Sequence, residues 1–193
     1  MPPLTLTLGR NLRLKGVPPE LKQALMEKLE FPNPKWLENE RMGRWNRATP
    51  RVLKFYDKVG ADGLWVPRGC LRQVLLMCRR MEVDYRLDDR RRSLPPVDFD
   101  FRGELRAFQK TAVDAMLARD FGTLSAPTGS GKTVMALNMV ARRRQPALVI
   151  VHTKDLAAQW VERIGAYLGI PSEECGMIAG GRVRIGAGIT VAL

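Results

Sequence analysis

Histidine and cysteine are scarce in this sequence, and their scarcity limits the chemistry that the protein can perform. The 193 residues include one histidine, His152, and three cysteines, Cys70, Cys78 and Cys175. The number of cysteines is odd and their spacing is not that of metal ligands, so we interpret them as reduced, buried thiols. A histidine-based metal centre or catalytic triad is not expected.

Long apolar runs and targeting signals are also lacking. No apolar run reaches the roughly 18–20 residues that span a bilayer. The opening stretch MPPLTLTLGR has neither the charged start nor the long apolar centre of a signal peptide. We therefore expect a cytoplasmic protein without a membrane partner. Apolar residues make up 45% of the chain, which is enough to build a core. The length permits one ordinary domain or two small ones.

Acidic residues are in the minority. The chain has 32 basic and 20 acidic residues, a net charge of +12. Both halves are basic, because residues 1–100 carry +7 and residues 101–193 carry +5. Such a balance favours a polyanionic partner, nucleic acid first. Composition alone leaves an ordinary protein with an alkaline isoelectric point equally open.

A change of character falls at residues 86–100, RLDDRRRSLPPVDFD, which are charged, then proline-bearing, and without periodicity. We interpret this stretch as a boundary, and predict an α+β domain over residues 1–90, a linker over 91–102 and a second domain over 103–193. In the first domain the patterns predict strands over 4–8 and 51–59, a turn over 60–63 before a strand at 64–67, and helices over 18–30 and 70–81.

The second domain alternates between strand and helix patterns. We expect helices over 104–120, from Thr133 onward and over 154–169, with strands over 122–126, 146–152 and 189–193. The apolar run PALVIVH, residues 146–152, is typical of a parallel strand covered on both faces. The alternation predicts an α/β fold with a parallel sheet, incomplete in this chain.

The loop between the first of these strands and the next helix has the composition of a phosphate-binding loop. It reads APTGSGKT and follows the pattern G-x-x-x-x-G-K-[ST], except that Ala126 replaces the first glycine. Glycines allow positive φ and let backbone N–H groups approach a phosphate, and the helix that follows directs its positive end there. We expect Lys132 to reach the β and γ oxygens of ATP and Thr133 to hold Mg²⁺. The expected cradle consists of Thr128, Gly129, Ser130, Gly131, Lys132 and Thr133.

The alanine-first loop resembles motif I of superfamily 2 helicases, and two further segments match in the order that this family requires. LRAFQ, residues 105–109, resembles the adenine-reading Q-motif of members outside the DEAD-box group. The resemblance implies that Gln109 reads the base, with Arg106 nearby; an ordinary glutamine on a helix surface is the alternative.

Residues 149–160, VIVHTKDLAAQW, resemble motif Ia, whose strand end and following helix touch the backbone of the tracked nucleic-acid strand. The resemblance implies phosphate contacts for Thr153 and Lys154, and less directly for Gln159. A solvated loop is the alternative. Residues 189–193, ITVAL, resemble the start of the next motif.

Together these segments resemble the branch that holds UvsW-like phage helicases, XPB-type repair helicases and the helicase subunits of type III restriction enzymes. Residues 31–56 and 64–69 resemble, more loosely, the accessory domain that precedes the motor in bacterial and phage members. The resemblance implies an ATP-dependent DNA helicase or translocase, and leaves open repair, recombination or restriction, as well as DNA versus RNA. Two alternatives are a P-loop NTPase that is not a helicase and a nucleic-acid-binding module with a vestigial loop.

Two parts of the family pattern are missing from this sequence. Residues 103–193 contain no D-E-x-[DHC] motif, which supplies a Mg²⁺ carboxylate and a water-orienting glutamate, and no second RecA-like domain. We therefore expect the chain to be a truncated N-terminal portion that does not hydrolyse ATP alone.

The stretch ENERMGRWNRATPR, residues 38–51, interleaves arginines with tryptophan. Arginine can pair with phosphates and tryptophan can stack on bases, so Arg44 and Arg47 beside Trp45 predict a nucleic-acid contact. A solvated basic face is an equally weighted alternative.

Overall fold

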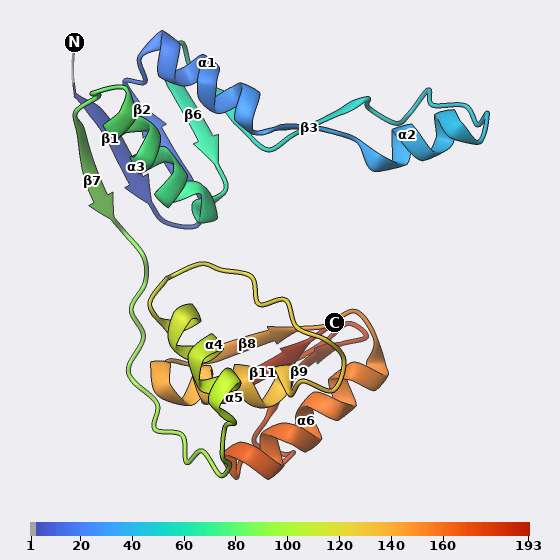
Figure 1. Cartoon of the computed structure of the whole chain (residues 1–193). Coiled ribbons are helices and arrows are strands. Elements are labelled where there is room, and N and C mark those ends of the chain that lie inside the picture. Colours follow the sequence, from blue (N-terminus) through green and yellow to red (C-terminus); the bar gives the residue numbers. More distant parts are fainter. Residues whose placement is uncertain (1–2) are drawn as a thin grey trace. The chain divides into compact units, whose positions relative to one another are not determined.

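A computed structural model describes residues 3–193, which divide into two compact units between Arg92 and Ser93. Each unit has a sheet and a hydrophobic core of its own (Figure 1). In the part of the chain that the structure describes, no helix is long and apolar enough to cross a membrane.

The first unit is built on a five-stranded sheet in the order β5-β6-β2-β1-β7, in which β1 and β7 are parallel and the other pairs are antiparallel. Alternation decides which face is buried: Leu4, Leu6 and Leu8 of β1 lie in the core, and the threonines between them are half-buried. The strands are β1 (Leu4–Leu8), β2 (Leu12–Lys15), β5 (Asp57–Val59), β6 (Gly63–Val66) and β7 (Tyr85–Asp89).

Two helices cover the buried face of this sheet (Figure 1). Helix α1 (Pro19–Lys28) begins on a proline, which needs no N–H partner in the first turn, and buries Leu21 and Leu25 one turn apart. Helix α3 (Leu71–Arg80) follows a short 3₁₀ turn, η1 (Arg68–Cys70), and packs Val74 and Cys78 against the same core.

An arm of residues 30–54 extends from this unit (Figure 1). Its stem is the antiparallel pair β3 (Glu30–Pro32) and β4 (Val52–Lys54), and helix α2 (Pro34–Arg41) lies beyond it. The single strand predicted over 51–59 is therefore wrong. Phe55 donates its N–H to the carbonyl of Leu29, and the chain then leaves the stem and enters β5 of the larger sheet.

The second unit has a four-stranded sheet in the order β10-β9-β11-β8, in which only the β9–β10 hairpin is antiparallel. The predicted α/β class with a parallel sheet is confirmed, although the hairpin was not foreseen. The elements are α4 (Ala107–Leu117), α5 (Lys132–Arg143), β8 (Ala147–Ile150), α6 (Lys154–Leu168), β9 (Gly176–Ala179), β10 (Arg182–Arg184) and β11 (Ile189–Ala192).

Two expectations for this unit's sheet are corrected. Residues 122–126 form no strand, because no other segment of the described chain pairs with them. Strand β8 is covered on one face only: Val149 packs into the core with α5 and α6, whereas Leu148 and Ile150 point to the other face and are 58% and 73% exposed. An apolar run reveals a strand but does not show how many layers cover it.

The segment predicted as a linker contains no helix or strand over residues 91–102. Its later part nevertheless packs on the second unit: Val97 donates its N–H to the carbonyl of Arg144 (3.0 Å), and Phe101 stacks on Tyr167 with ring centroids 6.2 Å apart. The strand β7, which the charged stretch did not suggest, belongs to the first unit, where Asp89 pairs with Arg91 at 2.7 Å.

Candidate nucleotide and nucleic-acid sites

The glycine loop has the backbone conformation that its composition predicts. Gly129 and Gly131 have φ values of +80° and +82°, in the left-handed region that side chains disfavour. Helix α5 starts at Lys132 with Gly131 as its N-cap, so the loop ends at a helix N-terminus. A Cβ atom on Gly129 would meet nothing within 4 Å. The loop thus presents open space beside bare backbone, as an anion cradle requires.

Lys132 lies over its own loop. Its Nζ donates to the carbonyl oxygens of Ala126 and Pro127, at 2.9 Å each, and the side chain is exposed. An ammonium has three donors and can exchange such carbonyl partners for more strongly charged phosphate oxygens. The cation is therefore already held at the loop.

Gln109 is buried, 7% exposed, and joins helix α4 to the loop. Its Oε1 accepts from the N–H of Arg106 and its Nε2 donates to the carbonyl of Ser130, both at 2.8 Å. A Cβ atom on Gly131 would lie 2.5 Å from Nε2. The alternative of an ordinary surface glutamine is therefore wrong. The amide supports the loop, and each of its polar atoms keeps one further hydrogen-bonding position.

Two side chains at the loop's end have hydroxyl groups suited to a nucleotide. The Oγ of Ser130 is buried and has no hydrogen-bond partner in the described part of the chain. Thr133 is the second residue of α5 and is half-buried. An unpartnered buried hydroxyl, the open space at Gly129 and the lysine together fit a triphosphate, and the Thr133 hydroxyl is a suitable Mg²⁺ ligand.

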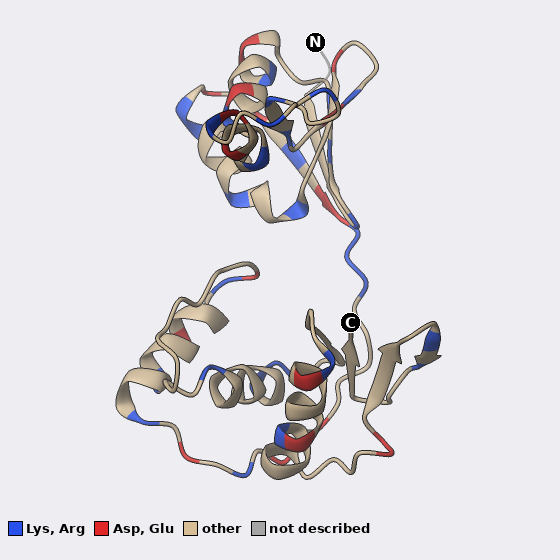
Figure 2. Cartoon of the chain, turned by 90° about the vertical axis from the view of Figure 1, so that its right-hand side faces the viewer, with Lys and Arg blue, Asp and Glu red and all other residues tan. Residues whose placement is uncertain are grey.

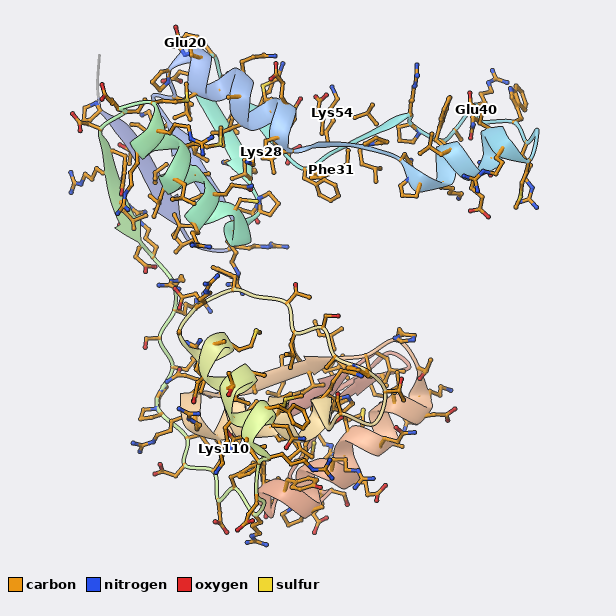
Figure 3. The ribbon with its side chains drawn as sticks, in the orientation of Figure 1. Glu20, Lys28, Phe31, Glu40, Lys54 and Lys110 are labelled. Carbon is orange, nitrogen blue, oxygen red and sulfur yellow. The ribbon has the colours of Figure 1, made fainter. Side chains whose placement is uncertain are left out.

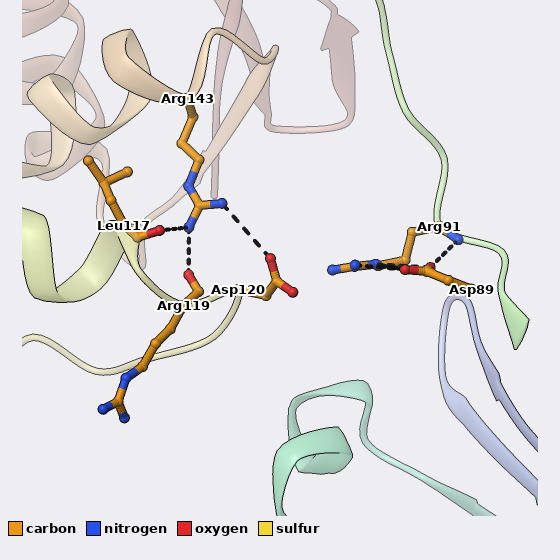
Figure 4. A network of polar contacts seen from close by, with 6 residues as sticks. All are labelled: Asp89, Arg91, Leu117, Arg119, Asp120 and Arg143. Carbon is orange, nitrogen blue, oxygen red and sulfur yellow. Dashed lines mark hydrogen bonds and ion pairs between the residues drawn. The ribbon is translucent and has the colours of Figure 1, made fainter. Parts of the chain in front are cut away.

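An arginine brace holds α4 against α5, the helix that starts at the loop. Arg143 donates to the carbonyls of Leu117 and Arg119 and lies 3.9 Å from the carboxylate of Asp120 (Figure 4). The residue before it, Arg142, pairs with Asp114 of α4 at 2.6 Å. Sequence reasoning missed the brace, since nothing in the run ARRRQ shows what each arginine meets.

The motif Ia segment lies at the start of α6. Thr153 is the N-cap, and its Oγ1 accepts from the N–H of Leu156 at 3.2 Å. Lys154 is the first helical residue and is exposed beside it. Gln159 is also exposed, but five residues along a helix place it roughly 140° around the axis from Lys154. The structure therefore brings Thr153 and Lys154 together and leaves Gln159 on another face.

The arm carries two arginine–tryptophan pairs. The guanidinium of Arg47 lies 5.4 Å from the ring centre of Trp45, and that of Arg51 lies 5.2 Å from the ring of Trp36. Trp45 is 80% exposed, and Arg44 next to it is exposed as well. The cation–π contact holds each guanidinium next to a tryptophan ring, so that a ligand can meet both groups together.

Three asparagines fix the shape of this arm. Asn33 caps α2 by accepting from the N–H of Lys35 at 3.0 Å and donates to the carbonyl of Pro50 at 2.8 Å. Asn39 donates to Asn46 at 2.9 Å, and Asn46 donates to the carbonyl of Trp36 at 3.0 Å. The two arginine–tryptophan pairs therefore lie on a loop that these hydrogen bonds hold in shape.

The charge of the first unit suits a polyanion. Residues 1–92 contain 20 basic and 11 acidic residues, a net charge of +9 (Figure 2). The arm is mixed in sign, since Glu40 also lies on it (Figure 3). The three cysteines are free thiols, and burial raises the pKa of each. This agrees with their interpretation as reduced thiols, although Cys70 is only half-buried.

Comparisons with known proteins match the second unit most specifically. Residues 102–192 match the family described as "Type III restriction enzyme, res subunit". The DNA 3'-5' translocase XPB2 of Sulfurisphaera tokodaii is 39% identical over 113 residues, which are 58% of this chain and 24% of that protein. UvrABC system protein B of Methanosarcina mazei is 39% identical over 77 residues, which are 37% of this chain and 12% of that protein. The chain spans about a quarter or less of the length of these relatives.

The fold is similar to that of a solved structure over nearly the whole chain. The crystal structure of the UvsW helicase from Bacteriophage T4 matches with a TM-score of 0.64 and 16% identity, covering 98% of this chain and 74% of that one. Neither alternative to a helicase is favoured by these relatives. Residues 102–192 are thus similar to type III restriction and XPB-type proteins, and the fold of the described chain is similar to that of the UvsW helicase.

Proposed function

We propose that this chain is the ATP-binding N-terminal portion of an ATP-dependent DNA helicase or translocase. The observation that carries the proposal is the loop itself. Two glycines in the left-handed conformation, the lysine over the loop and the buried Gln109 bridge form a cradle at a helix N-terminus. DNA is the proposed track because the similar proteins include a DNA 3'-5' translocase.

Different residues of the cradle bind the phosphates, the metal and the base of Mg·ATP. Lys132 and the backbone N–H groups of residues 129–133 bind the phosphates, and the Thr133 hydroxyl holds one position of Mg²⁺. The metal, when bound, neutralises phosphate charge. Gln109 and Arg106 form the base side of the site, where the second N–H and second lone pair of the Gln109 amide read adenine. Thr128 and Ser130 shape the loop.

The nucleic-acid contacts are proposed for two separate surfaces, one on each unit. Thr153 and Lys154 offer a hydroxyl, an ammonium and a helix N-terminus to the phosphate backbone, with Gln159 a more distant member. Arg44 and Arg47 of the arm offer guanidinium groups beside Trp45.

Titration of the whole chain with a fluorescent ATP analogue tests the nucleotide site. Lys132→Ala is expected to weaken binding by about 10- to 100-fold, the range for loss of a hydrogen bond to a charged group. Lys110→Ala is the matched control, because it removes the same charge from an exposed position on α4 outside the loop. Equal affinities for the two variants would refute the phosphate site.

DNA-stimulated phosphate release by the same protein tests the catalytic part. We expect no turnover that depends on Lys132, because the sequence over residues 103–193 has no D-E-x-[DHC] carboxylates. In related enzymes an arginine finger alone is worth about 10³–10⁵ in rate. Phosphate release that disappears in Lys132→Ala would show that the carboxylates lie elsewhere in this chain.

A further inference from the structure

Two adjoining hollows lie at the foot of the arm in the first unit. The larger, about 660 Å³, has Phe31, Phe55 and Lys28 in its wall. The smaller, about 280 Å³, has Lys54, Phe55 and Trp65 in its wall. The hollows adjoin at Phe55 and Pro67, and we call the two together the aromatic cleft. Lys28, Phe31 and Lys54 lie near one another at this point of the chain (Figure 3).

The rings of the cleft are unusually open to solvent. Phe31, Phe55 and Trp65 are 48%, 47% and 41% exposed. Phe31 and Phe55 meet edge to face, with centroids 5.6 Å apart and planes at 76°. This arrangement uses the edge of one ring and one face of the other, and a further aromatic group can stack only on the remaining faces.

Backbone pairing and a polar cluster hold the cleft in shape. Glu30 and Lys54 are directly paired in the β3–β4 stem; Phe31 follows Glu30 within β3, and Phe55 follows Lys54 just after the end of β4. Tyr56 donates its hydroxyl to Glu30 at 2.6 Å, and Lys54 lies 3.4 Å from the same carboxylate. The rings are therefore presented by a fixed frame, and a ligand would not need to order them.

The charged residues beside the rings indicate what kind of ligand the cleft would bind. Lys28 and Lys54 flank the rings, and Arg13 lies directly across from Trp65 in the strand pairing. Glu30 is paired with Lys54, and Asp57 lines the smaller hollow, so the cleft carries both signs of charge, with Lys28 and Arg13 outside that pair. Open aromatic faces beside cations, in a unit of net charge +9, match a polyanion that also carries flat rings.

We propose that the aromatic cleft binds unpaired bases of a single-stranded nucleic acid, with Phe31, Phe55 and Trp65 as the stacking surface and Lys28 and Lys54 at the phosphates. The inference rests on the proposed nucleic-acid function and places a second contact of the first unit at the foot of the arm. The amides of Asn11 and Gln73, which also line the cleft, can meet the edges of any base. An apolar peptide would offer no anionic group to Lys28 and Lys54.

Fluorescence anisotropy with two labelled oligonucleotides of equal length tests the cleft, using the whole chain. One is oligo-dT and the other is an abasic strand with the same phosphates. The double variant Phe31→Ala/Phe55→Ala is expected to bind oligo-dT about ten-fold more weakly and the abasic strand unchanged, because stacking needs the bases. Phe31→Tyr/Phe55→Tyr should restore binding. Leu76→Ala, at a 49% exposed site on α3, is the matched control for loss of surface apolar area.

The outcomes separate this inference from the function on which it rests. If the unmutated chain binds neither strand, the nucleic-acid interface of the proposed function fails and the cleft fails with it. If the unmutated chain binds both and the double variant is unaffected, only the cleft is refuted. Equal weakening on both strands, with an unchanged circular dichroism spectrum, would also refute stacking.

Discussion

The candidate sites of the two units are built from different kinds of group. In the second unit the site is made of backbone: two left-handed glycines, a helix N-terminus and one buried amide that bonds to the carbonyl of Ser130. In the first unit it is made of exposed side chains, such as Trp45 at 80% exposure with Arg47 over its ring. A backbone site tolerates few substitutions, whereas a surface site can lose one member and keep the rest.

Exposed apolar residues occur on both units. On the first unit's arm and its foot they include the aromatic Phe31, Trp45 and Phe55 as well as aliphatic residues such as Leu37, and Arg47 lies over the ring of Trp45. Those of the second unit include the aliphatic Leu148 and Ile150 on an uncovered sheet face. Rings with charges indicate ligand binding, whereas a bare aliphatic sheet face indicates only that parallel strands are normally covered on both sides.

The largest contrast is expected between two glycines of the same loop. Both Gly129→Ala and Gly131→Ala place a side chain in the left-handed region, at a cost of about 1–2 kcal/mol. Only at Gly131 would the new Cβ also press against Gln109, 2.5 Å from Nε2. In a titration with a fluorescent ATP analogue, we expect Gly129→Ala to weaken binding about ten-fold. Gly131→Ala is expected to weaken binding of the analogue by at least about a further ten-fold.

This pair of variants tests whether the site of the second unit depends on backbone geometry, as the comparison between the units assumes. If both variants lose the same affinity, the Gln109 bridge has no part in holding the loop. If neither variant loses affinity, the site is not made of backbone at all.

Substitution of Gln109 sharpens the account of the nucleotide site. Gln109→Ala removes both the bridge to Ser130 and the groups proposed to read adenine. We expect weaker binding of ATP and GTP, a smaller gap between them, and weaker binding of tripolyphosphate by about five-fold, the value of one ordinary hydrogen bond. Tripolyphosphate has no base, so the loss of affinity for it measures the support of the loop alone.

Each half of the expectation for Gln109 can fail separately. Unchanged tripolyphosphate binding would show that the bridge is dispensable. An unchanged ratio of ATP to GTP affinity, or equal binding of both by the unmutated protein, would remove the adenine-reading role.

The sequence predicts the backbone site better than the surface site, for a physical reason. Glycine adopts the left-handed conformations of residues 129 and 131 at the lowest cost, so residue type reports geometry there. The role of Gln109 as a loop support could not be predicted in the same way. Its partner is a backbone carbonyl 21 residues away, and a carbonyl leaves no signal in residue type.

The fold of the first unit was predictable where alternation or helical spacing was strong. Strand β1 and helix α1 bury the leucines that the patterns marked. The arm was missed because its helix α2 has no buried residue and its shape depends on amide contacts such as Asn39 to Asn46. The pairing of Arg47 with Trp45 likewise depends on a turn that no periodicity records.

A smaller effect is expected from the arginines of the arm. Arg44→Ala/Arg47→Ala removes two proposed phosphate contacts from exposed positions. Because each contact releases counterions, the slope of log affinity against log salt concentration should fall by about 1.4–1.8. Anisotropy titrations of a labelled forked DNA at several salt concentrations measure this slope. Arg79→Ala/Arg80→Ala removes the same charge from exposed positions on α3 and should leave the slope unchanged. Equal salt slopes for the two double variants would show that the arm is only a solvated basic face.

The smallest effect is expected at the frame of the aromatic cleft. The hydrogen bond from Tyr56 is the main cause that lowers the pKa of Glu30, and Lys54 contributes less. A lowered carboxyl pKa stabilises the fold above the ordinary value of 4.5, and this stabilisation is lost as the pH falls through the folded pKa. Tyr56→Phe should therefore raise the pKa of Glu30 toward its ordinary value and reduce the loss of stability on acidification. The group is exposed, so the change in stability should be slight, whereas an NMR titration of the Glu30 carboxyl should detect the shift. Lys54→Ala should raise the pKa less than Tyr56→Phe does. The reverse order would mean that charge, and not the tyrosine hydroxyl, holds Glu30 in place.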